Sequence, residues 1–264
     1  MKLSVLAVLA GTALACIDVS TIETRQQNSG TDGSTADTVM CDPGCPPSSC
    51  TNPPPDPSTG LVSGLEYMCG LLDQVDGRDG DWFTYGNGDS LVSPRPGMFV
   101  PSCTGAEGSC HSACMSGQIK GDNYPYTNLG FNFRKNPAPY DLSRYRAVSF
   151  FLSGHVGAQS AIRFQIPLAA DANPGAGGMC LSNCNDSYQY TIGTFGPPSP
   201  PTGWINFEIP FTELTRLGFS GAIETWDPST AIGMVWSVVA SPGIQVVDGD
   251  DFTLCVDQVV LIPN

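Results

Sequence analysis

Apolar and polar residues alternate with a period of two in several short runs after residue 60, and each run is bounded by Gly or Pro. In Ser160–Leu168 three apolar residues share one face: Ile162, Phe164 and Ile166. Arg163 and Gln165 occupy the other face. Because successive side chains of a strand point to opposite faces of a sheet, this alternation predicts a strand with one buried and one solvated face.

Five more runs of this kind predict further strands: Tyr145–Leu152, Tyr188–Ile192, Trp204–Phe211, Ile232–Val239 and Phe252–Ile262. Only Phe211–Leu217, which lies between Pro210 and Gly218, predicts a short helix. Many short strands with almost no helix predict an all-β fold, either a β-sandwich or a jelly roll.

Composition points to the same fold class. The chain has 264 residues, of which 30 are Gly and 23 are Pro, and only 14% are charged. Long surface helices with many ion pairs cannot be built from so few charges, whereas Gly and Pro suit the turns between short strands.

The first sixty residues differ from the rest. Residues 1–15 have the features of an export signal, because Lys2 precedes an apolar stretch that ends in the small-residue cleavage site Ala13-Leu14-Ala15. Residues 16–60 contain no Phe, Trp or Tyr and are rich in Ser, Thr, Asp, Gly and Pro. Such a segment buries too little apolar area to offset its ordering entropy, so it predicts a disordered tether. The β-sandwich domain is then expected at residues 61–264.

Cys16 follows the cleavage site directly. Bacterial lipoproteins carry their lipid on a cysteine in this place, although Ala13 differs from the Leu that usually lies three residues before it. The chain has eleven cysteines, so removing Cys16 leaves ten, an even number that can pair fully. We therefore expect a membrane-anchored lipoprotein at the cell surface, with plain secretion as the alternative.

Export to an oxidising compartment favours disulfides among the remaining cysteines. Cys180 and Cys184 are expected to close one short loop. The segment Cys110-His111-x-x-Cys114 has a superficial likeness to a zinc ligand pair. Zinc sites usually combine tighter, repeated spacings with more histidine, and this chain has only two histidines, so disulfides are the better reading.

The net charge of −14 limits the classes of partner. Nucleic acid and anionic membrane surfaces are bound by basic faces, so the charge argues against both. Membrane contact is expected only through the lipid on Cys16.

Several fragments occur in a characteristic order along residues 61–264. They are Leu71–Gly77, Gly80–Tyr85, Tyr140–Tyr145, Trp204–Leu214 and Cys255–Val259. In order and spacing they resemble the galactose-binding-domain-like jelly rolls found among bacterial carbohydrate-binding modules. The resemblance implies a jelly-roll β-sandwich that binds a polysaccharide.

The same resemblance implies a structural calcium ion near the first and last strands. Four carboxylates are candidate ligands, of the kind that calcium prefers: Asp73, Asp76, Asp79 and Asp257. Gln74 and Gln258 stand where the family has Asp, which removes negative charge from the site. The alternative is that residues 76–80 form only a polar turn, which Asp and Gly favour.

The resemblance also implies a ligand-binding sheet face. Arg163 and Gln165 resemble the polar pair on that face in the family. Trp236, Tyr188 and Tyr190 are candidate surfaces for stacking against a sugar ring. We assign Trp82 and Trp204 to the core.

Two alternatives to a binding module stay open. A glycoside hydrolase or polysaccharide lyase needs a carboxylate pair, and such pairs assemble in space rather than in sequence. No Gly-x-Ser-x-Gly or His-Glu-x-x-His motif occurs, and no catalytic residue is assigned. A structural or adhesion lipoprotein without a small ligand is the other alternative.

If Cys16 carries lipid, the mature protein should partition into the detergent phase of a phase-separation assay. Cys16→Ser should move it to the aqueous phase, because the lipid then has no attachment point. A wild-type protein found wholly in the aqueous phase would rule out the anchor.

Overall fold

A computed structural model describes residues 60–65, 70–87, 89–102, 104–106, 109–121, 124–193, 203–218, 225–241 and 244–264. The predicted export signal, Cys16 and the predicted tether up to residue 59 lie outside these ranges. Within them, no helix is both long enough and apolar enough to cross a membrane.

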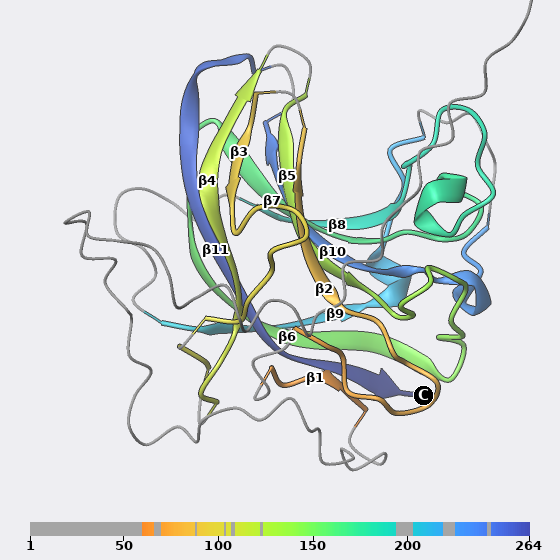
Figure 1. Ribbon diagram of the computed structural model, residues 1–264. Helices are drawn as coiled ribbons and strands as arrows, with labels where there is room; N and C mark the ends of the chain where they lie inside the picture. Colours follow the sequence, from red (N-terminus) through yellow and green to blue (C-terminus); the bar gives the residue numbers. More distant parts are fainter. Residues whose placement is uncertain are drawn as a thin grey trace, which may run out of the picture. The chain divides into compact units, whose positions relative to one another are not determined.

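The described strands are β1 (Leu61–Ser63), β2 (Trp82–Gly86), β3 (Leu91–Ser93), β4 (Ala113–Gly121), β5 (Tyr126–Asn132), β6 (Tyr145–Val156), β7 (Ser160–Ile166), β8 (Tyr188–Gly193), β9 (Ile205–Pro210), β10 (Gly233–Ala240) and β11 (Val246–Pro263). They form two antiparallel sheets (Figure 1). The β11 sheet has the order β3-β4-β11-β6-β9, with β1 also paired to β11, and the β10 sheet has the order β2-β5-β10-β7-β8.

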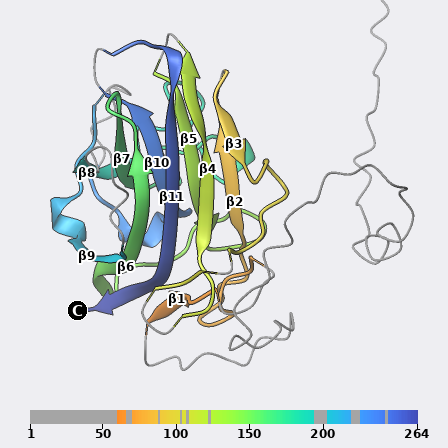
Figure 2. The ribbon, with the colours of Figure 1, turned by 90° about the vertical axis from the view of Figure 1, so that its left-hand side faces the viewer.

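The two sheets pack face to face, and Figure 2 shows the β11 sheet in front of the β10 sheet. The chain crosses between them repeatedly, since β4, β6, β9 and β11 belong to one sheet and β5, β7, β8 and β10 to the other. The predicted all-β jelly-roll sandwich is therefore confirmed, and each of the six predicted strands overlaps an observed one.

The predicted helix at Phe211–Leu217 is wrong. Only Phe211–Glu213 forms a turn of 3-10 helix. The chain then leaves the helix because the backbone of Thr215 pairs with that of Gln189 on β8, through two N–H···O bonds of 2.9 Å. A sheet edge that offers free backbone groups here outweighs the local helical preference.

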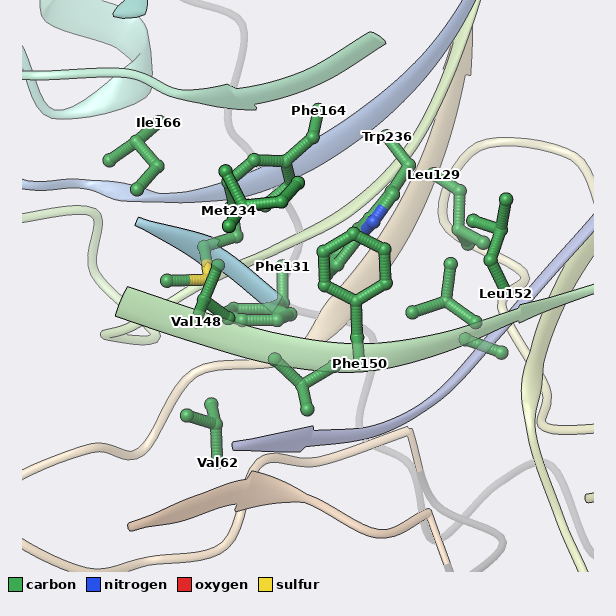
Figure 3. Packing of buried hydrophobic residues seen from close by; sticks show 14 of the residues in the cluster. Val62, Leu129, Phe131, Val148, Phe150, Leu152, Phe164, Ile166, Met234 and Trp236 are labelled. Atoms are coloured by element: carbon green, nitrogen blue, oxygen red, sulfur yellow. The ribbon is translucent and has the colours of Figure 1, made fainter. Parts of the chain in front are cut away.

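Aromatic side chains fill the space between the sheets. Trp236 of β10 is fully buried, stacks on Trp82 with ring centroids 5.7 Å apart and meets Phe150 of β6 edge to face at 5.1 Å. Figure 3 shows Phe150 pointing from β6 toward Trp236 in the opposite sheet. The assignment of Trp82 to the core is confirmed, whereas Trp204 is half-buried and lies outside the core cluster.

One disulfide joins two cysteines that lie far apart in the sequence, and another joins two that lie close together. Cys114 on β4 and Cys255 on β11 are directly opposite in the register of the β11 sheet and are bonded across 141 residues. Cys180 and Cys184 are bonded across four residues, the short loop expected from the sequence. Cys110 is also disulfide-bonded, so the cysteines of the zinc-like segment are used in cystines.

These two bonds should differ in their effect on stability. Loop-closure entropy in the unfolded chain predicts a loss of about 5 kcal/mol in unfolding free energy for Cys114→Ser with Cys255→Ser, and about 2 kcal/mol for Cys180→Ser with Cys184→Ser. Urea unfolding of both double variants at equal pH measures the two losses. Equal losses would show that restriction of the unfolded chain is not what the Cys114–Cys255 bond contributes.

Candidate functional site

The two faces of β7 have opposite chemistry. Ile162, Phe164 and Ile166 are fully buried in the core, as the alternation predicts. Arg163 and Gln165 are half-buried and lie on the face of the β10 sheet that points away from the core. We call this the outer face.

The strand register extends the outer face across all five strands of the β10 sheet. Residues directly opposite one another form a row that we call the central row: Tyr85, Asn128, Ser237, Arg163 and Thr191. The next row, two residues along each strand, is called the second row: Phe83, Gly130, Val235, Gln165 and Gln189. Five segments far apart in the sequence thus contribute to one surface.

Hydrogen bonds connect four strands within these rows. The Ser237 hydroxyl lies 2.6 Å from Asn128 Oδ1 and 2.8 Å from Gln165 Oε1. Gln165 Nε2 donates to Gln189 Oε1 at 3.3 Å. Ser237 is only 2% exposed, so it holds the amides of its neighbours in place from below. Side-chain amides fixed in this way present donors and acceptors in a set pattern.

Aromatic side chains gather at the β2 end of the outer face. Tyr85 is 47% exposed, and its ring centroid lies 6.2 Å from that of the half-buried Tyr126. Burial, with the neighbouring Tyr85, raises the pKa of the Tyr126 phenol. Phe83 lies against Gly130, where a Cβ would come within 3.2 Å of the Phe83 ring. This end of the face therefore carries three aromatic rings.

Arg163 brings a positive charge to the middle of a neutral surface. Its neighbours in register are Ser237 and Thr191, and no residue of the two rows is acidic. Burial lowers the pKa of the guanidinium, and Arg163 forms no ion pair within the described residues. The group stays protonated at neutral pH.

The predicted stacking residues do not share this face. Trp236 is fully buried, so it is core and cannot stack against a sugar. Tyr188 and Tyr190 pair with Ile166 and Phe164 and therefore point inward. Tyr188 is 8% exposed and contacts Trp226 at 5.1 Å, and Tyr190 packs against the core. The prediction that these three rings lie beside Arg163 and Gln165 is wrong.

Tyr85, Tyr126 and Asn128 were missed by the sequence reasoning. Their signal is the alternation within Trp82–Gly86 and Tyr126–Asn132, two runs that are short or interrupted by Gly and Asn. Which face each side chain occupies could be assigned only once the pairing of β2 with β5 and of β5 with β10 was known.

The four carboxylates proposed for calcium have other partners. Asp76 forms an ion pair with Arg144 at 2.6 Å, and Asp79 accepts the backbone N–H of Lys135 at 3.1 Å. Asp257 is fully buried and accepts the backbone N–H groups of Ala106 and Gln258, each at 2.7 Å.

Asp73 is buried, and one of its carboxylate oxygens, Oδ2, has no hydrogen-bond partner among the described residues. Beside it lies the buried Arg78, whose Nη2 donates to the Leu61 carbonyl at 2.7 Å and whose charge opposes the rise in the Asp73 pKa. In the described part of the chain, no three His, Cys, Asp or Glu side chains come together as a metal site. The described carboxylates thus do not fit the expected ligand set, and calcium binding stays a prediction.

The fold is similar to that of several solved structures. A family 11 carbohydrate-binding module from Clostridium thermocellum, in complex with a β-1,3-1,4-mixed-linked tetrasaccharide, is 17% identical over 77% of this chain and 95% of that chain, with a TM-score of 0.48. A family 30 carbohydrate-binding module of a cellulosomal cellulase of the same organism is 13% identical over 69% and 92%, with a TM-score of 0.45. The K3 cleaved adhesin domain of Lys-gingipain from Porphyromonas gingivalis is 14% identical over 69% and 91%, with a TM-score of 0.35. By sequence, neither a known protein family nor a curated protein matches the chain.

Burial raises the pKa of the Asp73 carboxyl from 3.8 to about 6. Because the folded protein holds this proton more tightly than the unfolded chain, the stabilisation is fully present below pH 4 and is lost as the pH rises through about 6. From pH 4 to pH 7 in EDTA, the unfolding free energy of wild type should therefore fall by about 2 to 3 kcal/mol relative to that of Asp73→Asn, whose amide does not titrate.

Asp79→Asn is the matched control for the loss of a carboxylate, since Asp79 is exposed whereas Asp73 is buried. The same series in calcium tests the ion. A bound cation would favour the ionised carboxylate, so the stability of wild type relative to Asp73→Asn would instead rise with pH.

Proposed function

We propose that this protein binds a polysaccharide on the outer face of its β10 sheet. The observation that carries the proposal is the combination of exposed and half-buried tyrosines with a fixed row of side-chain amides on one surface. A pyranose has apolar faces, which suit an aromatic ring, and a polar rim, which suits amide donors and acceptors.

The distance between Tyr85 and Arg163 suits a chain of sugars rather than a single sugar. Tyr85 on β2 and Arg163 on β7 lie in the same row, three strand intervals apart. At the spacing of neighbouring strands this is about 14 Å. One ligand contacts both Tyr85 and Arg163 only if it is an extended oligosaccharide segment that runs along the central row, across the strands.

Binding without cleavage is the activity that the two rows support. Glycoside hydrolysis needs two carboxyl groups on either side of the scissile bond. Neither the central nor the second row holds an Asp or Glu. A reducing-sugar assay run beside each binding measurement separates the two activities, since a hydrolase would release new reducing ends.

We further propose that the domain is displayed outside the cell on a tether anchored through Cys16. The apolar leader, the cysteine directly after its cleavage site and the disulfides of the domain support this location. Partitioning of wild type and Cys16→Ser between detergent and water tests the anchor.

Tyr85→Ala should weaken binding to a retained glycan about ten- to thirtyfold, because a tyrosine that contacts the ligand often supplies around 2 kcal/mol. Affinity electrophoresis against a panel of soluble polysaccharides identifies the glycan, and isothermal titration calorimetry measures the loss. The melting temperature should change little, because the side chain is exposed.

Ile205→Ala is the matched control. Ile205 is 42% exposed, close to the value for Tyr85, but lies on β9 in the opposite sheet. An equal loss of affinity in both variants, or none in Tyr85→Ala, would place the binding surface elsewhere.

A further inference from the structure

Arg163 is the feature of the outer face that neutral sugars do not explain. Sugar hydroxyls are already matched by the neutral amides of Asn128 and Gln165 and the hydroxyl of Thr191. A guanidinium differs from these groups by its permanent charge and by its planar fork of N–H donors, which fits a carboxylate with two parallel bonds.

Half-burying this charge carries a free-energy cost in the free protein. Burial lowers the pKa of Arg163, and the two residues opposite it in register, Ser237 and Thr191, are uncharged. Three of the six other arginines in the described residues form ion pairs: Arg144 with Asp76, Arg146 with Glu208, and Arg216 with Asp171. A ligand anion placed against Arg163 would supply the missing counter-charge.

The net charge of the protein limits how many anionic groups that ligand carries. At −14 the whole chain repels a continuous polyanion, and one arginine in two otherwise neutral rows matches one negative group. Tyr85 and the half-buried amides of Asn128 and Gln165 are available for the uncharged remainder of the ligand.

We propose that the ligand is a largely neutral polysaccharide with isolated uronic acid residues, and that the uronate carboxylate binds Arg163 while neutral sugars lie along the central row toward Tyr85. This inference rests on the proposed function and specifies its substrate class. Arg163 is the residue that determines specificity for the acidic sugar.

Matched pairs of oligosaccharides test the inference by calorimetry. Each uronate-containing oligosaccharide is measured beside the same compound after reduction of its carboxyl group to a primary alcohol. The set comprises glucuronate-substituted xylan fragments, polygalacturonate fragments and a neutral mixed-linked β-glucan. We expect the tightest binding from a neutral backbone with sparse uronate, and carboxyl reduction should weaken it about ten- to a hundredfold, the value of a hydrogen bond to a charged group.

Arg163→Gln should lower affinity for the uronate form by the same factor and leave affinity for the reduced form nearly unchanged. This double-mutant cycle separates a direct charge contact from a structural role, which would weaken both ligands alike. Arg163→Lys keeps the charge without the planar fork, so its affinity for the uronate form should lie between those of wild type and Arg163→Gln. Arg146→Gln, on the opposite sheet, is the control and should change neither affinity.

The outcomes distinguish the inference from the proposed function. If neutral glycans bind as tightly as uronate forms and Arg163→Gln affects both alike, the inference is overturned while polysaccharide binding stands. Tightest binding of the polygalacturonate fragments would overturn the requirement for isolated charges. If no glycan in the set binds, the proposed function fails, and the inference fails with it.

Discussion

The packing of Trp236 between the two sheets fixes the facing of every strand in the β10 sheet. Its indole contacts Trp82 on β2, Phe164 on β7 and Phe150 in the opposite sheet. Because side chains alternate along a strand, placing Trp236 inward places Ser237 outward. A slip of one residue would exchange the faces, exposing the aromatic core and burying the polar row, so the core enforces the register on which the site depends.

The same constraint explains how residues distant in the sequence come to share one surface. The cross-strand pairs that bring Phe164 beside Trp236 also bring Arg163 beside Ser237. A sheet held by a packed aromatic core is also rigid, which suits a site whose groups must match a ligand without rearrangement.

The fold and the two β7 residues of the site, Arg163 and Gln165, could be predicted from the sequence. The residues whose face depends on strand pairing could not. The alternation in Ser160–Leu168 was long enough to assign Arg163 and Gln165 to the outer face, and the structure places them there. Trp236, Tyr188 and Tyr190 were given the wrong face, since an aromatic ring suits either core or ligand and only the partner strand shows which. The short strand Trp82–Gly86 has Trp82 on one face and Phe83 and Tyr85 on the other, so aromatic residues alone did not show which face is buried.

The groups of the outer face differ in what they gain from a ligand. Gln165 already donates to the buried Gln189, so a sugar hydroxyl that binds Gln165 replaces an existing hydrogen bond, and the net gain in affinity is small. Their value is geometric, because fixed donors and acceptors reject a sugar whose hydroxyls are misplaced. The exposed ring of Tyr85 and the charge of Arg163 have fewer existing interactions to give up on binding. A ligand contact with either therefore contributes more to affinity. Affinity should thus come from Tyr85 and Arg163, and discrimination between sugars from the side-chain amides beside them.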